Sequence, residues 1–311
     1  MAMLNHQHSE DSKGSRGLAQ VAADADLTTR ETLNLDDCAL QTLPQTICQL
    51  TNLRVLSLYK NELTALPESL WQLGNLVTLN LADNRLVSIS QGIGQLDELQ
   101  MLDLGHNRLT HLPGALGELR KLRFLYPSDN QLSTLPQSLQ QLQQLVYLNL
   151  TDNQFAELPE WLGALTNLIE FRLYNNRLAT LPGRIGQLVK LRELYAMNNQ
   201  LTVLPASIGD LSKLRKLNLQ SNQLTALPDT IGNLTQLTEL DLRFNRLTEL
   251  PSTLANLKSL RFLDLRANQL RMLPESLAAL ELEKLDLRWN RLSTYPNWLG
   301  ELEQRGCLIY T

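Results

Sequence analysis

The chain has 311 residues, of which 43% are hydrophobic and 19% are charged, and its formal net charge is −4 at pH 7. Acidic and basic residues alternate without a long run of either sign, which argues against bulk binding of nucleic acid or of an anionic membrane surface. No stretch is apolar enough to predict membrane insertion. The three cysteines, Cys38, Cys48 and Cys307, form no paired clusters, which favours a reducing, cytoplasmic compartment.

The N-terminal segment divides into two predicted parts. Residues 1–14 are polar and contain no signal-peptide core, so we expect a disordered leader, in which a non-classical export signal for secretion as an effector stays an open alternative. Residues 15–29 are the predicted N-terminal cap, because Ser15 can cap a helix that carries one apolar stripe. The stripe consists of Leu18, Val21, Ala22 and Ala25.

Residues 30–311 form a repeat array. Asparagine recurs at a constant 23-residue spacing, and the series extends back to Cys38 and forward, by a final step that is one residue shorter, to Asn290. This makes twelve repeats without an inserted domain, and a period of this length indicates a solenoid. The recurring asparagines, which we name the ladder asparagines, are Asn61, Asn84, Asn107, Asn130, Asn153, Asn176, Asn199, Asn222, Asn245 and Asn268, with Asn290 at the end.

The frame around each ladder asparagine is L-x-x-L-x-L-x-x-N-x-L-x-x-L-P-x-x-I-G-x-L-x-x, as in LRVLSLYKNELTALPESL. It resembles the leucine-rich repeat, in the 23-residue form of intracellular Ras-suppressor and Scribble-like proteins, plant Ras-group proteins and many bacterial repeat proteins. The resemblance covers almost the whole chain. It implies an α/β solenoid, a horseshoe with a parallel concave β-sheet, short helical or 3-10 turns on the convex side, and ladder asparagines that bond to the backbone of their own and adjacent turns.

A few positions depart from the frame. Ser90 replaces the proline that opens most convex turns, and Pro127 and Ala196 replace the second strand leucine, so we expect two weaker strands. At the C-terminus, Leu308 and Tyr310 fall where the two strand leucines of a thirteenth unit would lie, which predicts a C-terminal capping strand.

The sequence offers no catalytic constellation. His106 and His111 lack neighbouring ligands at metal-binding spacing, and no phosphate-binding, dinucleotide-binding or hydrolase motif occurs. Cys307 resembles the catalytic cysteine of repeat-bearing ubiquitin ligases only in residue type, since those enzymes carry a separate domain after the repeats. We therefore predict no enzyme activity, no metal and no cofactor.

Three columns of residues line the predicted concave face, lying six, four and two residues before each ladder asparagine. We name them the first, second and third concave columns. Bulky residues gather in the middle of these columns, and aromatic residues, methionine and arginine are the types enriched at interfaces. Simple packing of aromatic side chains on one another is the alternative interpretation. The predicted partner-binding residues, named the central cluster, are Met101, Phe124, Tyr126, Tyr147, Arg172, Tyr174, Tyr195 and Met197.

A second pattern, LDLRFN, LDLRAN and LDLRWN, stacks three aspartates beside three arginines near the C-terminus. A self-neutralising charge ladder explains it better than an anion site, because the aspartates occupy the guanidinium groups. With two aromatic neighbours it forms the second-choice patch: Arg243, Phe244, Arg266, Arg288 and Trp289.

These features predict a monomeric, non-catalytic scaffold that binds a protein partner on its concave face. Analogy with Ras-group repeats suggests a small GTPase or a phosphatase as that partner, although a shared fold is a weak warrant for function. Two alternatives stay open. One is a bacterial effector that acts on host proteins by binding, and the other is the substrate-recognition subunit of a separate enzyme such as a ubiquitin ligase.

Overall fold

Alternation of buried and outward-facing residues in each repeat produces a three-residue strand. The computed structural model, which describes residues 29–311, pairs these strands in parallel and in sequence order within one sheet. Most neighbouring strands pair at the spacing of the repeat, as in Thr32 opposite Val55, so residues of one column lie side by side. The strands are β1 (Thr32–Asn34), β2 (Val55–Ser57), β3 (Thr78–Asn80), β4 (Met101–Asp103), β5 (Phe124–Tyr126), β6 (Tyr147–Asn149), β7 (Glu170–Arg172), β8 (Glu193–Tyr195), β9 (Lys216–Asn218), β10 (Glu239–Asp241), β11 (Phe262–Asp264), β12 (Lys284–Asp286) and β13 (Leu308–Tyr310).

A short 3-10 helix forms the convex side of each repeat between β1 and β12. Proline precedes most of these helices, and its carbonyl accepts the first helical hydrogen bond, as Pro44 does from the Ile47 N–H at 3.1 Å. Ser90, which replaces proline, also accepts the first helical hydrogen bond, from the Ile93 N–H at 3.3 Å, and its side chain accepts a further one from the Gly92 N–H at 3.1 Å. The helices are η2 (Gln45–Gln49), η3 (Glu68–Gln72), η4 (Gln91–Gln95), η5 (Gly114–Glu118), η6 (Gln137–Gln141), η7 (Glu160–Ala164), η8 (Ile185–Gln187), η9 (Ala206–Asp210), η10 (Asp229–Asn233), η11 (Ser252–Asn256) and η12 (Glu275–Ala279).

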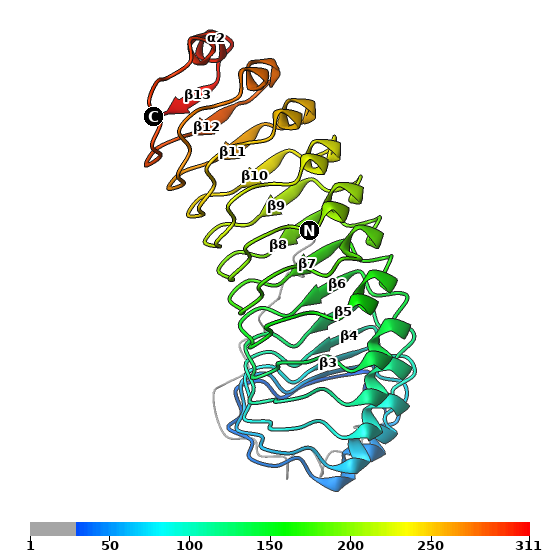
Figure 1. The fold of residues 1–311 in the computed structure, drawn as a ribbon. Coiled ribbons are helices and arrows are strands. Elements are labelled where there is room, and N and C mark those ends of the chain that lie inside the picture. Colours follow the sequence, from blue (N-terminus) through cyan, green and yellow to red (C-terminus); the bar gives the residue numbers. More distant parts are fainter. Residues whose placement is uncertain (1–28) are drawn as a thin grey trace.

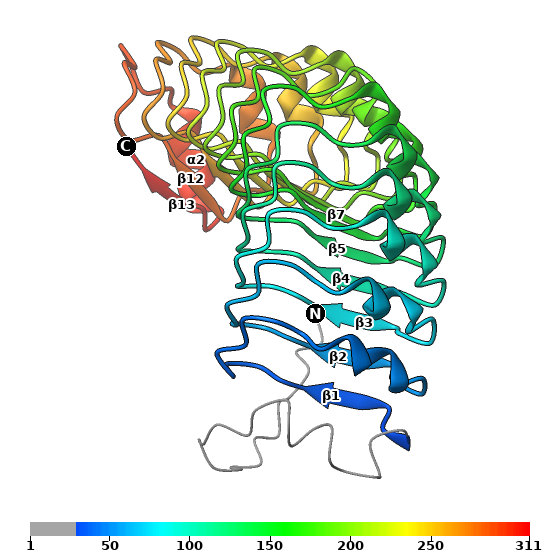
Figure 2. The same cartoon turned by 90° about the horizontal axis from the view of Figure 1, so that it is seen from below.

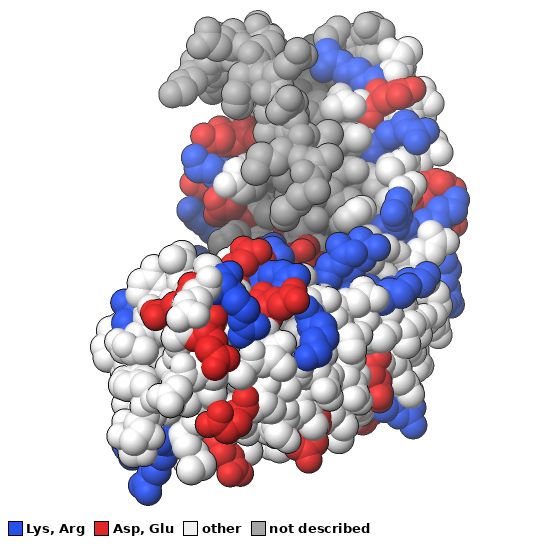
Figure 3. Space-filling model, turned by 90° about the horizontal axis from the view of Figure 1, so that it is seen from above, with Lys and Arg blue, Asp and Glu red and all other residues white. Residues whose placement is uncertain are grey.

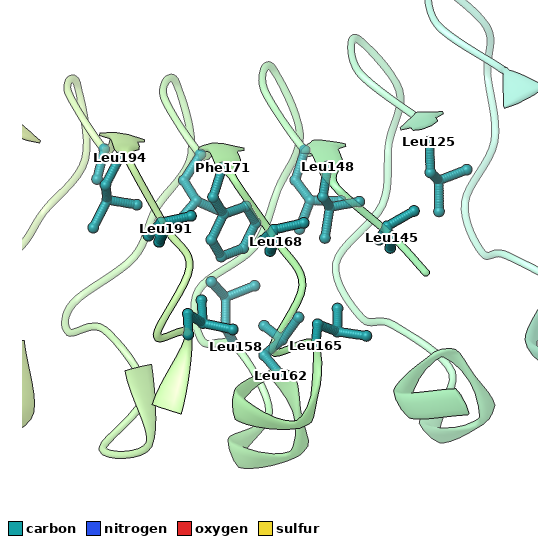
Figure 4. Packing of buried hydrophobic residues seen from close by; sticks show 14 of the residues in the cluster. Leu125, Leu145, Leu148, Leu158, Leu162, Leu165, Leu168, Phe171, Leu191 and Leu194 are labelled. Carbon is teal, nitrogen blue, oxygen red and sulfur yellow. The ribbon is translucent and has the colours of Figure 1, made fainter. Parts of the chain in front are cut away.

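The coils stack along a curved path from β1 at one end to β13 at the other, with the strands on one side and the 3-10 helices on the other (Figures 1 and 2). The hydrophobic core fills the space between these two sides. Figure 4 shows Leu148, Phe171 and Leu194 of successive strands facing Leu162 and Leu165 of the convex side. Because each repeat covers the apolar face of the next, contacts between adjacent repeats stabilise the array. The predicted leucine-rich repeat horseshoe is confirmed.

The ladder asparagines connect successive coils. The Asn84 Nδ2 donates to the carbonyl of Leu58 in the preceding repeat at 2.9 Å and to that of Leu81 in its own repeat at 3.1 Å. Its Oδ1 accepts the Leu63 N–H at 3.0 Å. The same contacts recur at Asn153, which is 8% exposed. The structural role assigned to these asparagines is therefore confirmed.

The two strands expected to be weak behave differently. Pro127 lies just beyond β5, and the β5–β6 pairing has two residue pairs where most neighbouring pairings have three. Ala196, in contrast, keeps its hydrogen bond to the Asn218 carbonyl at 2.9 Å, and β8 pairs over its full length on both sides. Proline removes a donor, whereas alanine removes only side-chain volume, so the expectation is confirmed for Pro127 and wrong for the pairing of the Ala196 strand.

The C-terminal strand is confirmed, but its predicted register is wrong by one residue. Leu308 and Tyr310 pair with Lys284 and Asp286, the concave-face positions of β12, and Ile309 pairs with Leu285, which faces the core. Leu308 and Tyr310 are consequently 60% and 40% exposed. The convex turn before β13 is a true α-helix, α2 (Trp298–Gln304), and the β12–β13 pairing is offset by one residue more than the usual repeat. A slip of one residue exchanges the two faces of a strand. The predicted leader at 1–14 and nearly all of the predicted cap at 15–29 lie outside the described residues.

Candidate partner-binding surface

The central cluster is contiguous on the concave sheet. Strand register places Met101 beside Phe124 and Phe124 beside Tyr147, all in the first column. In the second column, Arg172 lies beside Tyr195. The third-column members, Tyr174 and Met197, follow their strands rather than belong to them, and their carbonyls accept hydrogen bonds from the adjacent turns.

Within this cluster the side chains pack on one another. The rings of Tyr126 and Tyr147 lie 4.7 Å apart between centroids. The Arg172 guanidinium carbon lies 5.6 Å from the ring centroid of Tyr147 and 5.5 Å from that of Tyr195, and its Nε donates to the Glu170 carboxylate at 2.7 Å. Such cation–π contacts stabilise by about 0.5–1 kcal/mol at partly exposed sites. The cluster is thus a pre-ordered, half-buried surface. Its aromatic side chains pack on one another and are also exposed enough to contact a partner.

The hydroxyls of Tyr126, Tyr147 and Tyr195 stay protonated over the physiological range. Burial is the main cause that raises the pKa of Tyr126, Tyr147 and Tyr195, and at Tyr195 the hydrogen bond to Glu193 raises it further. The Tyr195 hydroxyl donates to the Glu193 carboxylate at 2.6 Å. The cluster therefore offers hydrogen-bond donors as well as apolar ring faces.

The predicted charge ladder is present at the C-terminal end of the same face. Arg266 contacts Asp264 at 2.6 Å and Asp286 at 3.3 Å, and Arg288 contacts Asp286 at 2.7 Å. The Asp286 side chain is fully buried. Burial alone would raise the pKa of Asp286, but hydrogen bonds from Arg288 and the charge of Arg266 lower it below its ordinary value. Seen from this end of the solenoid, acidic and basic side chains lie beside each other (Figure 3).

The aromatic members of the second-choice patch occupy an unusual backbone conformation. The residue before each ladder asparagine has a positive φ, and several repeats place Asp or Asn there. Phe244 and Trp289 adopt φ values of 56° and 61°, although bulky residues rarely do so. Their rings lie 6.4 Å apart, and their exposed fractions are 46% and 65%. This exposed aromatic pair borders the arginines of the charge ladder.

Sequence reasoning missed a groove of about 340 Å³ on the concave face of β8–β12. Its floor is formed by Leu217, Leu240 and Leu263. First-column residues of β9–β12 form one wall, and second-column residues of β8–β11 form the other. Only Tyr195 belongs to both the groove and the central cluster. The sequence signal that could have indicated this groove is the mixture of large and polar residues in the first and second concave columns.

In residues 29–311, no three His, Cys, Asp or Glu side chains come together as metal ligands would. No helix in this part of the chain is long and apolar enough to cross a bilayer. Its cysteines are free, and Cys307 is buried, with burial as the main cause that raises its thiol pKa.

Comparison with protein families identifies the fold. A family model described as leucine-rich repeat matches residues 31–86, 74–132, 197–247, 212–270 and 235–292, and a second leucine-rich repeat model matches residues 144–165. The chain therefore belongs to the leucine-rich repeat family. Among the curated proteins, none matches this chain.

Solved structures show the same architecture. A leucine-rich repeat protein of Leptospira interrogans is 34% identical with a TM-score of 0.62, and the match covers 90% of this chain and 83% of that chain. The ectodomain of the receptor kinase GASSHO1/SCHENGEN3 from Arabidopsis thaliana is 30% identical with a TM-score of 0.59, covering 90% of this chain and 41% of that one. A TDR receptor is 30% identical with a TM-score of 0.78, covering 88% and 49%. The chain spans less than half of each of these two receptor chains.

Proposed function

We propose that this protein is a non-catalytic scaffold that binds a protein partner on its concave face, as a monomer in the cytoplasm. The observation that carries the proposal is the central cluster. Its aromatic and arginine side chains are ordered by mutual contacts before any partner arrives. Binding by such a surface loses little conformational entropy, which favours affinity.

The similar proteins support binding as the activity of this fold. The GASSHO1/SCHENGEN3 ectodomain is described in complex with CASPARIAN STRIP INTEGRITY FACTOR 2, and the plant peptide hormone receptor RGFR1, 26% identical to this chain, is described in complex with RGF2. The 23-residue intracellular type of repeat, and a small GTPase or phosphatase as partner, belong to this proposal by analogy.

Affinity capture with mass spectrometry tests the proposal. The test variant changes Tyr126, Tyr147 and Tyr195 to Ser together, and a matched variant changes the same three residues to Phe. The serine variant removes the rings and should lose partner capture, by about 2 kcal/mol or more for each true hot spot. The phenylalanine variant keeps the rings and should retain most of it.

Two controls separate binding from folding. Val203→Ser changes a side chain that is 56% exposed and lies outside the sheet, so its partner capture should equal that of the wild type. Circular dichroism and thermal melting should show that the serine variant is folded, with a lowered melting temperature because the three rings are half-buried. Unchanged partner capture by the folded serine variant would eliminate the central cluster as the binding surface.

A further inference from the structure

The groove on β8–β12 has the dimensions of a site for an extended chain. It crosses five strands, and four steps of about 4.8 Å give a length of roughly 19 Å. About six residues of an extended segment span that distance, at roughly 3.3 Å per residue. The Leu217, Leu240 and Leu263 side chains beneath its floor are only 1% exposed, so the accessible apolar surface comes from Phe262 in its wall, which is 42% exposed. An occupant can therefore bury apolar surface there.

The charged side chains around the groove differ in how fully other groups of the protein neutralise their charge. Lys216 lies 3.5 Å from Glu239, and Asp264 is held by the Arg266 side chain through contacts as short as 2.6 Å. The Lys284 ammonium lies over the Tyr310 ring, 5.2 Å from its centroid. These groups already have partners within the protein.

Asp241 in the groove wall has a cationic partner that it shares with a second acceptor, and its Oδ1 accepts the Arg243 N–H at 3.2 Å. Arg243 contacts its carboxylate at 3.2 Å, but the same guanidinium donates two shorter hydrogen bonds, of 2.9 and 2.6 Å, to Gln220. The Asp241 side chain is 22% exposed, and burial is the main cause that raises its pKa to about 6, against the lowering effect of Arg243. A partly desolvated carboxylate that shares its cation can accept a further charge-assisted hydrogen bond.

We propose that the groove binds an extended segment of the protein partner in which a lysine or arginine pairs with Asp241 and an apolar side chain packs against Phe262. Phe262 lies one strand away from Asp241 and two residues off in register, which is about 8 Å in sheet geometry. Side chains two residues apart on an extended chain are separated by roughly 7 Å. The recognised pattern is therefore a basic residue and an apolar residue with one residue between them. This inference rests on the proposed function and specifies the chemistry of the partner.

Binding of this kind is coupled to the protonation of Asp241. The charged groups that act on the Asp241 pKa are Arg243 and Arg266, which lower it, and Asp264, which raises it. Two further charged residues, Lys216 and Glu239, line the same groove. A bound cation favours the ionised carboxylate, so affinity should increase as pH rises through about 6 and level off above it. The arginine side chains beside Asp241 keep their charge over this range, so they do not reverse the trend.

Selection from a displayed random-peptide library against the intact protein tests the inference. Enriched peptides should carry Lys or Arg two positions from an apolar residue. Synthetic copies should bind Asp241→Asn at least about tenfold more weakly than wild type, because the loss of one charge partner leaves the other uncompensated. Asn218 occupies the same column and accepts the same backbone hydrogen bond, from the Gln220 N–H at 3.1 Å, so asparagine fits this position without loss of the fold.

Asp103→Asn is the matched control. Asp103 occupies the same column on β4, accepts the Gly105 N–H at 2.9 Å and has a pKa raised mainly by burial, but it lies outside the groove. It should leave peptide affinity and its pH dependence unchanged. Enriched peptides without a basic residue, or equal binding to the wild-type and Asp241→Asn proteins, would overturn the inference.

The same data separate this inference from the proposed function. Peptides that lose binding on the triple tyrosine-to-serine variant but not on Asp241→Asn would keep the concave-face function and reject the groove as the site. Peptides whose binding survives both sets of substitutions would reject both proposals.

Discussion

Replacing one ladder asparagine measures how strongly successive coils are coupled. Asn153→Ala removes a side chain whose Nδ2 donates to the carbonyls of Pro127 at 3.0 Å and Leu150 at 3.2 Å, and whose Oδ1 accepts the Leu132 N–H at 3.0 Å. The site is only 8% exposed, so water cannot fully replace these bonds. An unsatisfied buried group costs about 1–3 kcal/mol, and the Leu132 N–H becomes such a group, whereas the Pro127 carbonyl keeps a longer hydrogen bond of 3.4 Å from the Asn130 Nδ2. The expected loss is therefore about 1–3 kcal/mol.

Urea denaturation followed by circular dichroism should show this loss as a lower midpoint for Asn153→Ala. Amide hydrogen exchange should also accelerate at Leu132, whose N–H loses its acceptor. The control is Gln154→Ala, an exposed neighbour that should change stability by no more than about 0.5 kcal/mol. An unchanged midpoint and unchanged exchange for Asn153→Ala would refute the assignment of the ladder asparagines as the bonds between coils.

Three further changes test the backbone and the electrostatics. Ala267→Gly should raise stability by about 1 kcal/mol in thermal melts because φ is 51° at this position, whereas Ala156→Gly, at an exposed position without a positive φ, should lower it by about 0.5–1 kcal/mol. Gly209→Ala should lower the stability measured in urea by about 1–3 kcal/mol because a Cβ would lie against the Thr230 carbonyl, and Gly300→Ala, which has open space around it, should not. Folding favours the protonated form of Asp241, whose pKa is raised to about 6, so wild-type stability should decline as pH rises from about 4 to 6. Asp241→Asn should show a smaller decline, since Asp103, whose pKa burial also raises, is unchanged, and parallel pH profiles for the two proteins would contradict the prediction.

Much of the fold can be predicted because the repeat period determines the position of each residue in its coil. A constant spacing of asparagine and leucine determines which residues face the core, and the observed pairing of equivalent residues in successive repeats follows from it. The error at Leu308 and Tyr310 arises where the period ends. The last convex turn becomes the helix α2, which adds a residue to the offset before β13, and a single added residue reverses the faces of a strand.

The surface was less predictable, for a physical reason. Column positions showed that Tyr147 and Arg172 share the concave face, and their contact is observed. Arg243 donates its shorter hydrogen bonds to Gln220 and makes a longer contact with the Asp241 carboxylate. The positions of these residues in the columns do not predict this choice of partner. That preference depends on side-chain geometry between neighbouring repeats, and it decides which wall of the groove can accept a charge.

The repeats themselves provide the reference by which unusual residues can be judged. Every position in one coil has equivalents in the others, and those equivalents show what folding alone requires. Asn198 satisfies the positive-φ position with φ 53°, yet Phe244 and Trp289 occupy the same position with exposed rings. Asn218 satisfies the second column, yet Asp241 places a desolvated carboxylate there. Both departures cost stability that the scaffold could avoid. The desolvated carboxylate also occurs at Asp103 on β4, whereas the two aromatic rings lie in the C-terminal repeats, between β10 and the turn after β12. Such local costs concentrate where proteins bind other molecules, which favours the proposal that the C-terminal repeats contribute to binding.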